Sequence, residues 1–414
     1  MHRGMTSAGM IVLTFVLLSG CGDNAMNASA PLKRMEPFAM KQFVIGTWPF
    51  SSRATEAFCT EAQAAGFNTL VDAPGMLDVA DKTGMKIIIT TMLNPVTDEK
   101  TGKWTGGWKL GPFAHLEQLK WFDERWGKHP ALAGYLLNDN CKLHDYTVEC
   151  GRWLRANRPW LIPYMSHNPN ADEQGKVADA LPIISTQNYP YGFHNDWPEA
   201  KKRRDFCDRL EADRANANKY DMVLWPIFAV YGKPDLGASQ IRFQAFSSVA
   251  YGAQGLFYFA YSGRRPAWRK GGSVVTAVTY CNDYIVPEVA PRVLGCRSIG
   301  VFHGAADTDA PDGSLPIIED AIVEDLDADA LAGVLVPEKT LAAGRHLPAY
   351  VMLVNKRTAT DPKRQPPARD VSVTFGTNVR KVTILGDDHR TGTVAGNTAT
   401  VTLAGGDGVL LRIE

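Results

Sequence analysis

The feature that most constrains the fold is a regular alternation along residues 42–300. Short runs rich in β-branched and aromatic residues are each followed by a stretch that suits a helix. This alternation is typical of parallel βα units. We expect eight strands, at residues 42–50, 68–73, 86–93, 133–138, 161–167, 183–189, 223–231 and 255–261. Helices are expected at residues 54–65, 77–83, 116–126, 145–157, 170–180, 198–218, 240–251 and 274–294.

Eight such units predict an α/β fold, a (β/α)8 TIM barrel, which typically takes about 250 residues. The alternative is a doubly wound open sheet. That fold commonly carries a Gly-rich GxGxxG turn after its first strand, and here Gly46–Phe50 reads GTWPF. The barrel is therefore favoured, and we place it at residues 37–305.

Beyond residue 305 the helical pattern ends. Short strands broken by turn residues are expected at residues 350–355, 371–375, 381–385, 399–403 and 408–413. Such a series predicts a small all-β sandwich domain, which we place at residues 315–414.

The amino terminus predicts export. Residues 1–21 have a short polar start and an apolar run over residues 10–18, too short to span a bilayer. The run ends in Leu18-Ser-Gly-Cys21, which resembles the lipobox of bacterial lipoproteins. This resemblance implies a lipid anchor on Cys21, a flexible tether over residues 22–36, and a place in the bacterial cell envelope, periplasmic or on the outer surface. The alternative is a plain cleavable signal peptide.

Charge and composition limit the classes of partner that the chain is expected to bind. The chain has 44 Lys and Arg against 44 Asp and Glu, so it lacks the basic surplus of a nucleic-acid binder. No cofactor motif and no metal-ligand spacing is present, so we expect neither a cofactor nor a metal. Six cysteines besides Cys21 permit several disulfide pairings, with 141–150 and 281–296 the closest in sequence.

In a (β/α)8 barrel the active site lies at the carboxyl ends of the strands. Those ends are rich in aromatic and amide side chains and poor in carboxylates, a lining that suits a neutral sugar. The candidate binding residues are Trp48, Asn138, Asn140, His167, Asn188, Tyr189, Tyr191, Tyr231 and Tyr261.

Two segments carry a family resemblance. HPALAGYLLNDN, residues 129–140, resembles the fourth-strand region of glycoside hydrolase-like barrels, where a similar stretch typically ends in Asp-Glu-Pro. VLWPIFAVY, residues 223–231, with the segment 241–259, resembles the seventh strand, following helix and eighth strand of that group. The resemblance implies a Glu acid/base after strand four and a Glu nucleophile after strand seven. Here Asn140 stands at the first position, and residues 228–232 hold no carboxylate.

Glycosidic bond cleavage normally uses two carboxyl groups. We therefore expect Asp139 to be the general acid, with Asp72 as base or nucleophile, the alternative partners being Asp98, Glu99, Asp196, Glu199 and Asp235. Asp139 is alternatively a buried structural carboxylate, and Asp72 a turn residue. The expected function is cleavage of an oligo- or polysaccharide; the alternative is a non-catalytic carbohydrate-binding lipoprotein that has lost the family carboxylates.

Overall fold

A computed structural model describes part of the chain. It covers residues 42–49, 55–91, 93–97, 104–110, 115–141, 143–167, 173, 176–194, 196–232, 235–261, 271–304, 310–318, 321–359, 361 and 363–414, with the backbone alone at 93–97, 104–110, 140–141 and 167. All of them belong to one compact unit, Met35–Glu414. The expected signal peptide, Cys21 and the tether lie outside the described residues and stay predictions.

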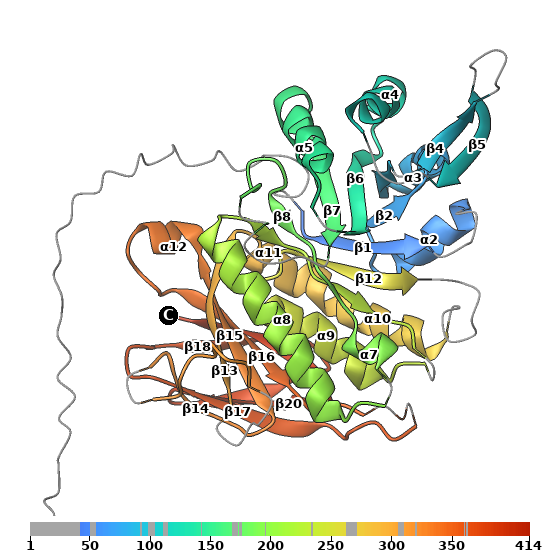
Figure 1. Cartoon of the computed structure of the whole chain (residues 1–414). Coiled ribbons are helices and arrows are strands. Elements are labelled where there is room, and N and C mark those ends of the chain that lie inside the picture. The colour runs from blue at the N-terminus through green and yellow to red at the C-terminus, as the bar shows by residue number, and fades with distance from the viewer. Residues whose placement is uncertain are drawn as a thin grey trace, which may run out of the picture. The chain divides into compact units, whose positions relative to one another are not determined.

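The first half of this unit is an eight-stranded parallel sheet that curls into a nearly closed barrel (Figure 1). The strand order is β7-β6-β3-β2-β1-β12-β11-β9. The strands are β1 (Val44–Pro49), β2 (Thr69–Asp72), β3 (Lys86–Thr90), β6 (Leu132–Cys141), β7 (Ile162–His167), β9 (Gln187–Asn188), β11 (Ile227–Ala229) and β12 (Gly255–Tyr261). Each lies within or overlaps one of the eight expected strands, so the (β/α)8 fold is confirmed.

The sixth and seventh strands are each split in two. Short strands β8 (Ile183–Ile184) and β10 (Val223–Leu224) pair with each other just before β9 and β11 begin. Side chains connect β7 to this sixth strand, because a hydrogen bond of 2.8 Å joins the hydroxyls of Tyr164 and Ser185.

Helices surround the sheet as expected, with three differences. They are α2 (Glu56–Ala64), α3 (Leu77–Thr83), α4 (Leu116–Trp126), α5 (Asp145–Asn157), α7 (Pro190–Phe193), α8 (Glu199–Lys219), α9 (Ala238–Ala250), α10 (Ser273–Tyr284) and α11 (Ala290–Val293). The helix expected at 170–180 is wrong over 176–180, which form turns. The helix expected at 274–294 is broken by a π-helical turn at Ile285–Val289, because Pro287 and Pro291 lack the backbone N–H that a continuous helix needs. The third is a hairpin that the sequence pattern missed, β4 (Leu93–Thr97) with β5 (Trp104–Leu110), which follows β3.

The barrel interior is filled with large side chains. Trp225 and Phe257 are fully buried inside it, and their ring centroids are 5.6 Å apart. Gly46 makes room for this packing, since a Cβ there would lie 2.2 Å from the Phe257 ring. The barrel is therefore a packed core, open to solvent at its rim rather than through its axis.

The second half is a β-sandwich of two antiparallel sheets, as expected. One has the order β13-β15-β16-β21-β18 and the other β14-β17-β20-β19. Their strands are β13 (Cys296–His303), β14 (Val323–Leu326), β15 (Ala330–Pro337), β16 (Ala349–Asn355), β17 (Arg369–Phe375), β18 (Val382–Leu385), β19 (Gly392–Ala395), β20 (Thr398–Leu403) and β21 (Gly408–Ile413), and α12 (Glu338–Ala342) follows β15. Because β13 pairs with β15, the sandwich begins before residue 315.

Five cysteines, Cys59, Cys150, Cys207, Cys281 and Cys296, are buried free thiols. The pairing of 281 with 296 is therefore wrong, as is that of 141 with 150, because Cys150 is unpaired. No helix within the described ranges is long and apolar enough to cross a membrane. Nor do three His, Cys, Asp or Glu side chains gather there in a way that suits a metal ion.

Candidate functional site

Asp139 reaches the barrel interior through a β-bulge. In β6, Leu136 packs inside the barrel and Leu137 packs outside it, against the helices. Simple alternation would then aim residue 138 inward and residue 139 outward. The register between β6 and β7 shifts between Leu136 and Asn138, and Asp139 pairs with Ser166. The extra residue thus re-aims Asp139 toward the interior.

Two donors hold one oxygen of the Asp139 carboxyl group. Ser166 Oγ donates to Oδ1, and Gln187 Nε2 donates to the same oxygen at 2.9 Å. Gln187 Nε2 also lies 3.0 Å from Ser166 Oγ, so the three side chains form a closed group, the polar triad. Burial raises the pKa of Asp139, and the hydrogen bonds from Ser166 and Gln187 pull it partly back. The net direction is upward.

Sequence reasoning missed Ser166 and Gln187. Ser166 lies on β7, the strand next to β6, and Gln187 lies on β9 in the sixth strand. Each is two residues beyond a buried inner residue, Tyr164 and Ser185 respectively. Side chains two residues apart in a strand point to the same face, so Ser166 and Gln187 could have been predicted once one inward residue on each strand was known.

An aromatic wall stands beside the polar triad. The ring of Phe259 is 5.2 Å from that of Tyr189 and nearly parallel to it, 5.8 Å from Trp48, and 5.6 Å from Tyr231. Phe193, at the end of α7, lies 5.7 Å from Tyr231 and is 60% exposed. The wall therefore runs from the buried interior out to solvent at the carboxyl ends of the strands. We call this end of the barrel the mouth. Trp48, Tyr189 and Tyr231 were sequence candidates; Phe193 and Phe259 were missed.

The aromatic wall is close enough to the polar triad for Asp139 to affect the pKa of Tyr189. Burial raises the pKa of Tyr189 well above its usual value, and the nearby charges of Asp139, Tyr164 and Tyr231 raise it further. Tyr189 therefore remains a neutral hydroxyl beside the Asp139 carboxyl group. The mouth combines one carboxyl group of raised pKa with neutral hydroxyl, amide and aromatic groups.

Asp72 lies on the other face of its strand. Val71 fills the barrel interior, and Asp72, the next residue, pairs with Ile89, which packs in the outer core. Burial raises the pKa of the Cys59 thiol of α2, and the nearby Asp72 carboxylate raises that pKa further, which places Asp72 on the helix side of the sheet. Burial raises the pKa of Asp72 to about 6, although Oδ1 accepts a 2.6 Å hydrogen bond from the Ala73 N–H. The structure thus separates Asp72 from the Asp139 group.

Four further candidates also point away from the mouth. Asn138 reaches the Thr147 hydroxyl of α5 at 3.5 Å, and Asn188 donates to the Phe206 carbonyl of α8 at 3.1 Å. Tyr191 packs between Phe206 and Phe243, and Tyr261 packs against Phe58 and Phe67. Alternate residues of a strand point to opposite faces of the sheet, and the sequence pattern alone did not show which residues face the barrel interior.

The remaining candidates divide in two. Asn140 is the penultimate residue of β6 and His167 the last of β7, but their side chains lie outside the described residues, as do Asp98 and Glu99 altogether. Asp196 is exposed, and Glu199 is held by the Thr358 hydroxyl at 2.6 Å and by Gln240 at 2.9 Å. No carboxylate of the described residues, Asp235 included, is among the groups that shift the pKa of Asp139.

Comparison with known proteins rests on the fold. No protein-family model matches the chain, and no curated protein matches it. Among solved structures, a glycoside hydrolase family 5 protein from Bacteroides vulgatus is 11% identical, with a TM-score of 0.51, over 90% of this chain and 88% of that one. A second structure, described as a glycoside hydrolase, is 12% identical, with a TM-score of 0.50, over 90% and 92%. The chain shares the overall fold of these two structures. At these identities the likeness establishes the fold alone.

Proposed function

We propose that the protein binds a carbohydrate at the barrel mouth and that Asp139 is the general acid for cleavage of a glycosidic bond there. The observation that carries this proposal is the placement of the polar triad directly beside the aromatic wall. Aromatic faces pack against the C–H faces of sugar rings, while hydroxyl and amide groups satisfy sugar hydroxyls. A carboxyl group of raised pKa in the same place is the feature that a general acid needs.

The hydrogen bonds of the triad suggest which oxygen carries the proton. Ser166 and Gln187 both donate to Oδ1. A protonated carboxyl group would therefore hold its hydrogen on Oδ2 and present it to the glycosidic oxygen. As the proton moves, the C–O bond breaks and the leaving sugar departs as an alcohol, while water adds to the anomeric carbon and loses a proton.

A base or nucleophile must complete this reaction. The position of Asp72 on the helix side of β2 does not favour it for this role. Asp98 and Glu99, in the segment between β4 and β5, stay candidates. The anchor on Cys21, which would hold the barrel at a bacterial envelope membrane, likewise stays part of the proposal.

Carbohydrate binding without cleavage is the second candidate function. It is favoured by Asn140 at the position where similar barrels carry a Glu, and by the lack of a described carboxylate that acts on Asp139. This protein would then use the polar triad and the aromatic wall as a binding surface alone.

Hydrolysis of a panel of aryl glycosides and plant, algal and microbial polysaccharides tests the proposal. We expect the chain to release sugar from at least one of them, and Asp139→Asn to lower the rate by about a hundredfold or more, because the amide cannot deliver the proton. Asp81→Asn, which changes an exposed carboxylate on α3, is the matched control and should retain full activity. Sugar binding with no turnover would favour the second candidate; turnover that survives Asp139→Asn would remove Asp139 from the acid role.

A further inference from the structure

A second pocket lies far from the barrel mouth, between the end of the barrel and the sandwich. It has a volume of about 460 Å³, within the roughly 300–1,000 Å³ of pockets that hold small molecules. Its walls come from α11, the start of β13, α12, β16 and β21. Gln254, immediately before β12, donates to the Cys296 carbonyl at 2.9 Å, so the pocket lies by the amino-terminal end of that strand. The mouth lies at the opposite end.

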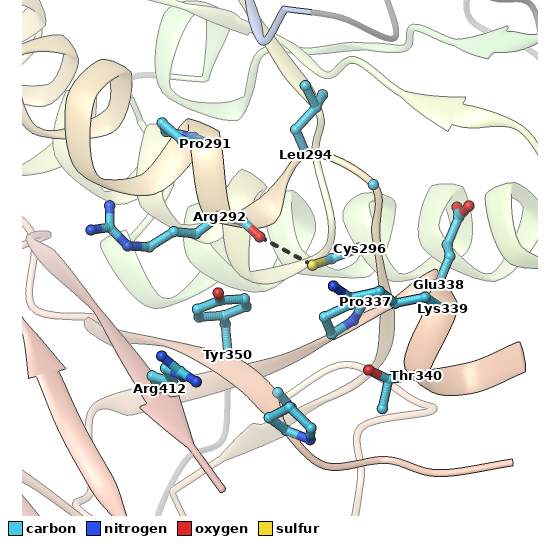
Figure 2. Close-up of a pocket in the computed structure, with 13 residues that line it drawn as sticks. Pro291, Arg292, Leu294, Cys296, Pro337, Glu338, Lys339, Thr340, Tyr350 and Arg412 are labelled. Carbon is cyan, nitrogen blue, oxygen red and sulfur yellow. Dashed lines mark hydrogen bonds between the residues drawn. The ribbon is translucent and has the colours of Figure 1, made fainter. Parts of the chain in front are cut away.

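Positive charge dominates the lining. Arg292, Lys339 and Arg412 are cationic, and Glu338 is the one acidic residue among them. The Glu338 carboxylate is already engaged by Arg297 at 3.1 Å. In Figure 2, Arg292, Tyr350 and Arg412 lie along one side of the pocket, and Cys296, Lys339 and Thr340 lie along the other.

The backbone register fixes one side of this arrangement. Tyr350 on β16 and Arg412 on β21 are directly paired across the antiparallel ladder, so their side chains lie next to each other on the same sheet face. An aromatic ring beside a guanidinium group offers a flat face to a ring and a fork of donors to an anion.

The floor adds no opposing charge. Cys296 Sγ donates to the Arg292 carbonyl at 3.3 Å, and burial raises the pKa of this thiol to about 12, so it is neutral at pH 7. The Glu338 carboxylate and the Lys339 ammonium are both close enough to act on that thiol, the carboxylate more strongly. Among the described residues, no carboxylate pairs with Lys339.

The two arginines have partners that a ligand can displace. Arg292 pairs with Glu288 at 3.2 Å, and Arg412 pairs with Glu414 at 2.6 Å. All four side chains are at least 33% exposed. Ion pairs at such exposure contribute little, so an anionic group that enters the pocket competes with them at small cost.

We propose that this pocket binds an acidic sugar residue through its carboxylate or sulfate group, with the Tyr350 ring against the sugar and Lys339 and Arg412 on the anion. The anionic character rests on the charges alone, while the assignment of a sugar rests on the proposed function. The pocket would be a second carbohydrate site, on the face of the molecule opposite the mouth.

Calorimetric titration of the full chain tests this with four probes: galacturonate, galactose 6-sulfate, neutral galactose and inorganic sulfate. We expect one or both acidic sugars to bind and galactose to bind at least about tenfold more weakly, with affinity falling as salt rises. Galacturonate alone would identify the carboxylate, and galactose 6-sulfate alone the sulfate, as the group recognised. Lys339→Gln and Arg412→Gln should each weaken binding about tenfold. Lys381→Gln, an exposed lysine of the same domain outside the pocket, is the matched control and should change nothing.

Asp139→Asn separates the two sites. Acidic sugar binding that survives Asp139→Asn and falls with Lys339→Gln supports the second pocket even if no hydrolysis is found. Binding that falls with Asp139→Asn and ignores Lys339→Gln would place the ligand in the mouth and overturn this inference. Equal binding of galactose, binding of inorganic sulfate without either acidic sugar, or no binding of any probe would also overturn it.

Discussion

Asp139 and Asp72 are both partly buried carboxyl groups at strand ends, but their neighbours give them different chemistry. Asp139 accepts hydrogen bonds from two side chains and lies beside an aromatic wall that reaches solvent. Asp72 has one backbone donor, and its Oδ2 is buried without a hydrogen-bond partner among the described residues. The first therefore lies beside the aromatic wall at the mouth, whereas the second faces the helices.

The pH dependence of stability should reveal the cost of ionising Asp72. Burial raises the pKa of Asp72 in the folded state to about 6, above its ordinary value of 3.8, so the folded state binds the proton more tightly than the unfolded state. The stabilisation is fully present below about pH 4 and is lost as the pH rises through about 6. Asp72→Asn removes this loss and should raise the free energy of unfolding by about 1–3 kcal/mol at pH 8.

Urea unfolding of Asp72→Asn and the parent chain at pH 4 and pH 8 measures this difference. The gain should be small at pH 4 and large at pH 8, since only the higher pH ionises the parent carboxyl group. A gain that is the same at both values would show that Asp72 titrates normally.

At the scale of elements, the sequence was informative about strands and uninformative about faces. All eight barrel strands were expected, because β-branched runs between helical stretches are a strong pattern. The bulge before Asn138 left no such pattern, and it decides that Asp139, rather than Asn138, faces the interior. Asn188 and Tyr191 were expected at the mouth but point away from it. The reason is related, since the sequence at a strand end does not show which of its alternate residues face the barrel interior. The hairpin β4–β5 was missed because its sequences, LNPVT and WTGGWKL, lack an uninterrupted run of β-branched residues.

The packed barrel interior predicts a large cost for Phe257→Ala. Phe257 is fully buried and touches the rings of Trp48, Tyr164 and Trp225. Removing its ring leaves a cavity that these rigid neighbours cannot fill, so we expect a loss of about 3–5 kcal/mol in the free energy of unfolding. Val394→Ala, at a position 41% exposed on β19, is the control and should change stability by less than about 0.5 kcal/mol. Urea unfolding measures both; a loss below about 1 kcal/mol for Phe257→Ala would mean that the interior is loosely packed.

At the scale of the whole molecule, the barrel and the sandwich share a core through α9. Gln244 on this helix donates to the Ala229 carbonyl of β11 at 3.0 Å, on the barrel side. On the other side, a Cβ at Gly333 of β15 would lie 2.0 Å from the Ala250 carbonyl, so the sandwich sheet packs directly on the helix backbone. The buried Arg390 joins the halves further, since it pairs with Asp407 at 2.8 Å beneath the ring of Tyr284. The sandwich therefore supports the barrel through shared packing and hydrogen bonds.

The central claim, that the barrel mouth is the carbohydrate site, is tested most directly by binding to a glycan array with exposed aromatic variants. Phe193 is 60% exposed at the mouth, and Trp160 is 52% exposed just before β7 begins, at the other end of the barrel. Both can be removed with little effect on folding. We predict that Phe193→Ala weakens binding of the strongest glycan by roughly threefold to tenfold, as expected for loss of one stacking ring, and that Trp160→Ala binds like the parent chain. Equal binding by all three proteins, or a loss confined to Trp160→Ala, would contradict the assignment of the mouth.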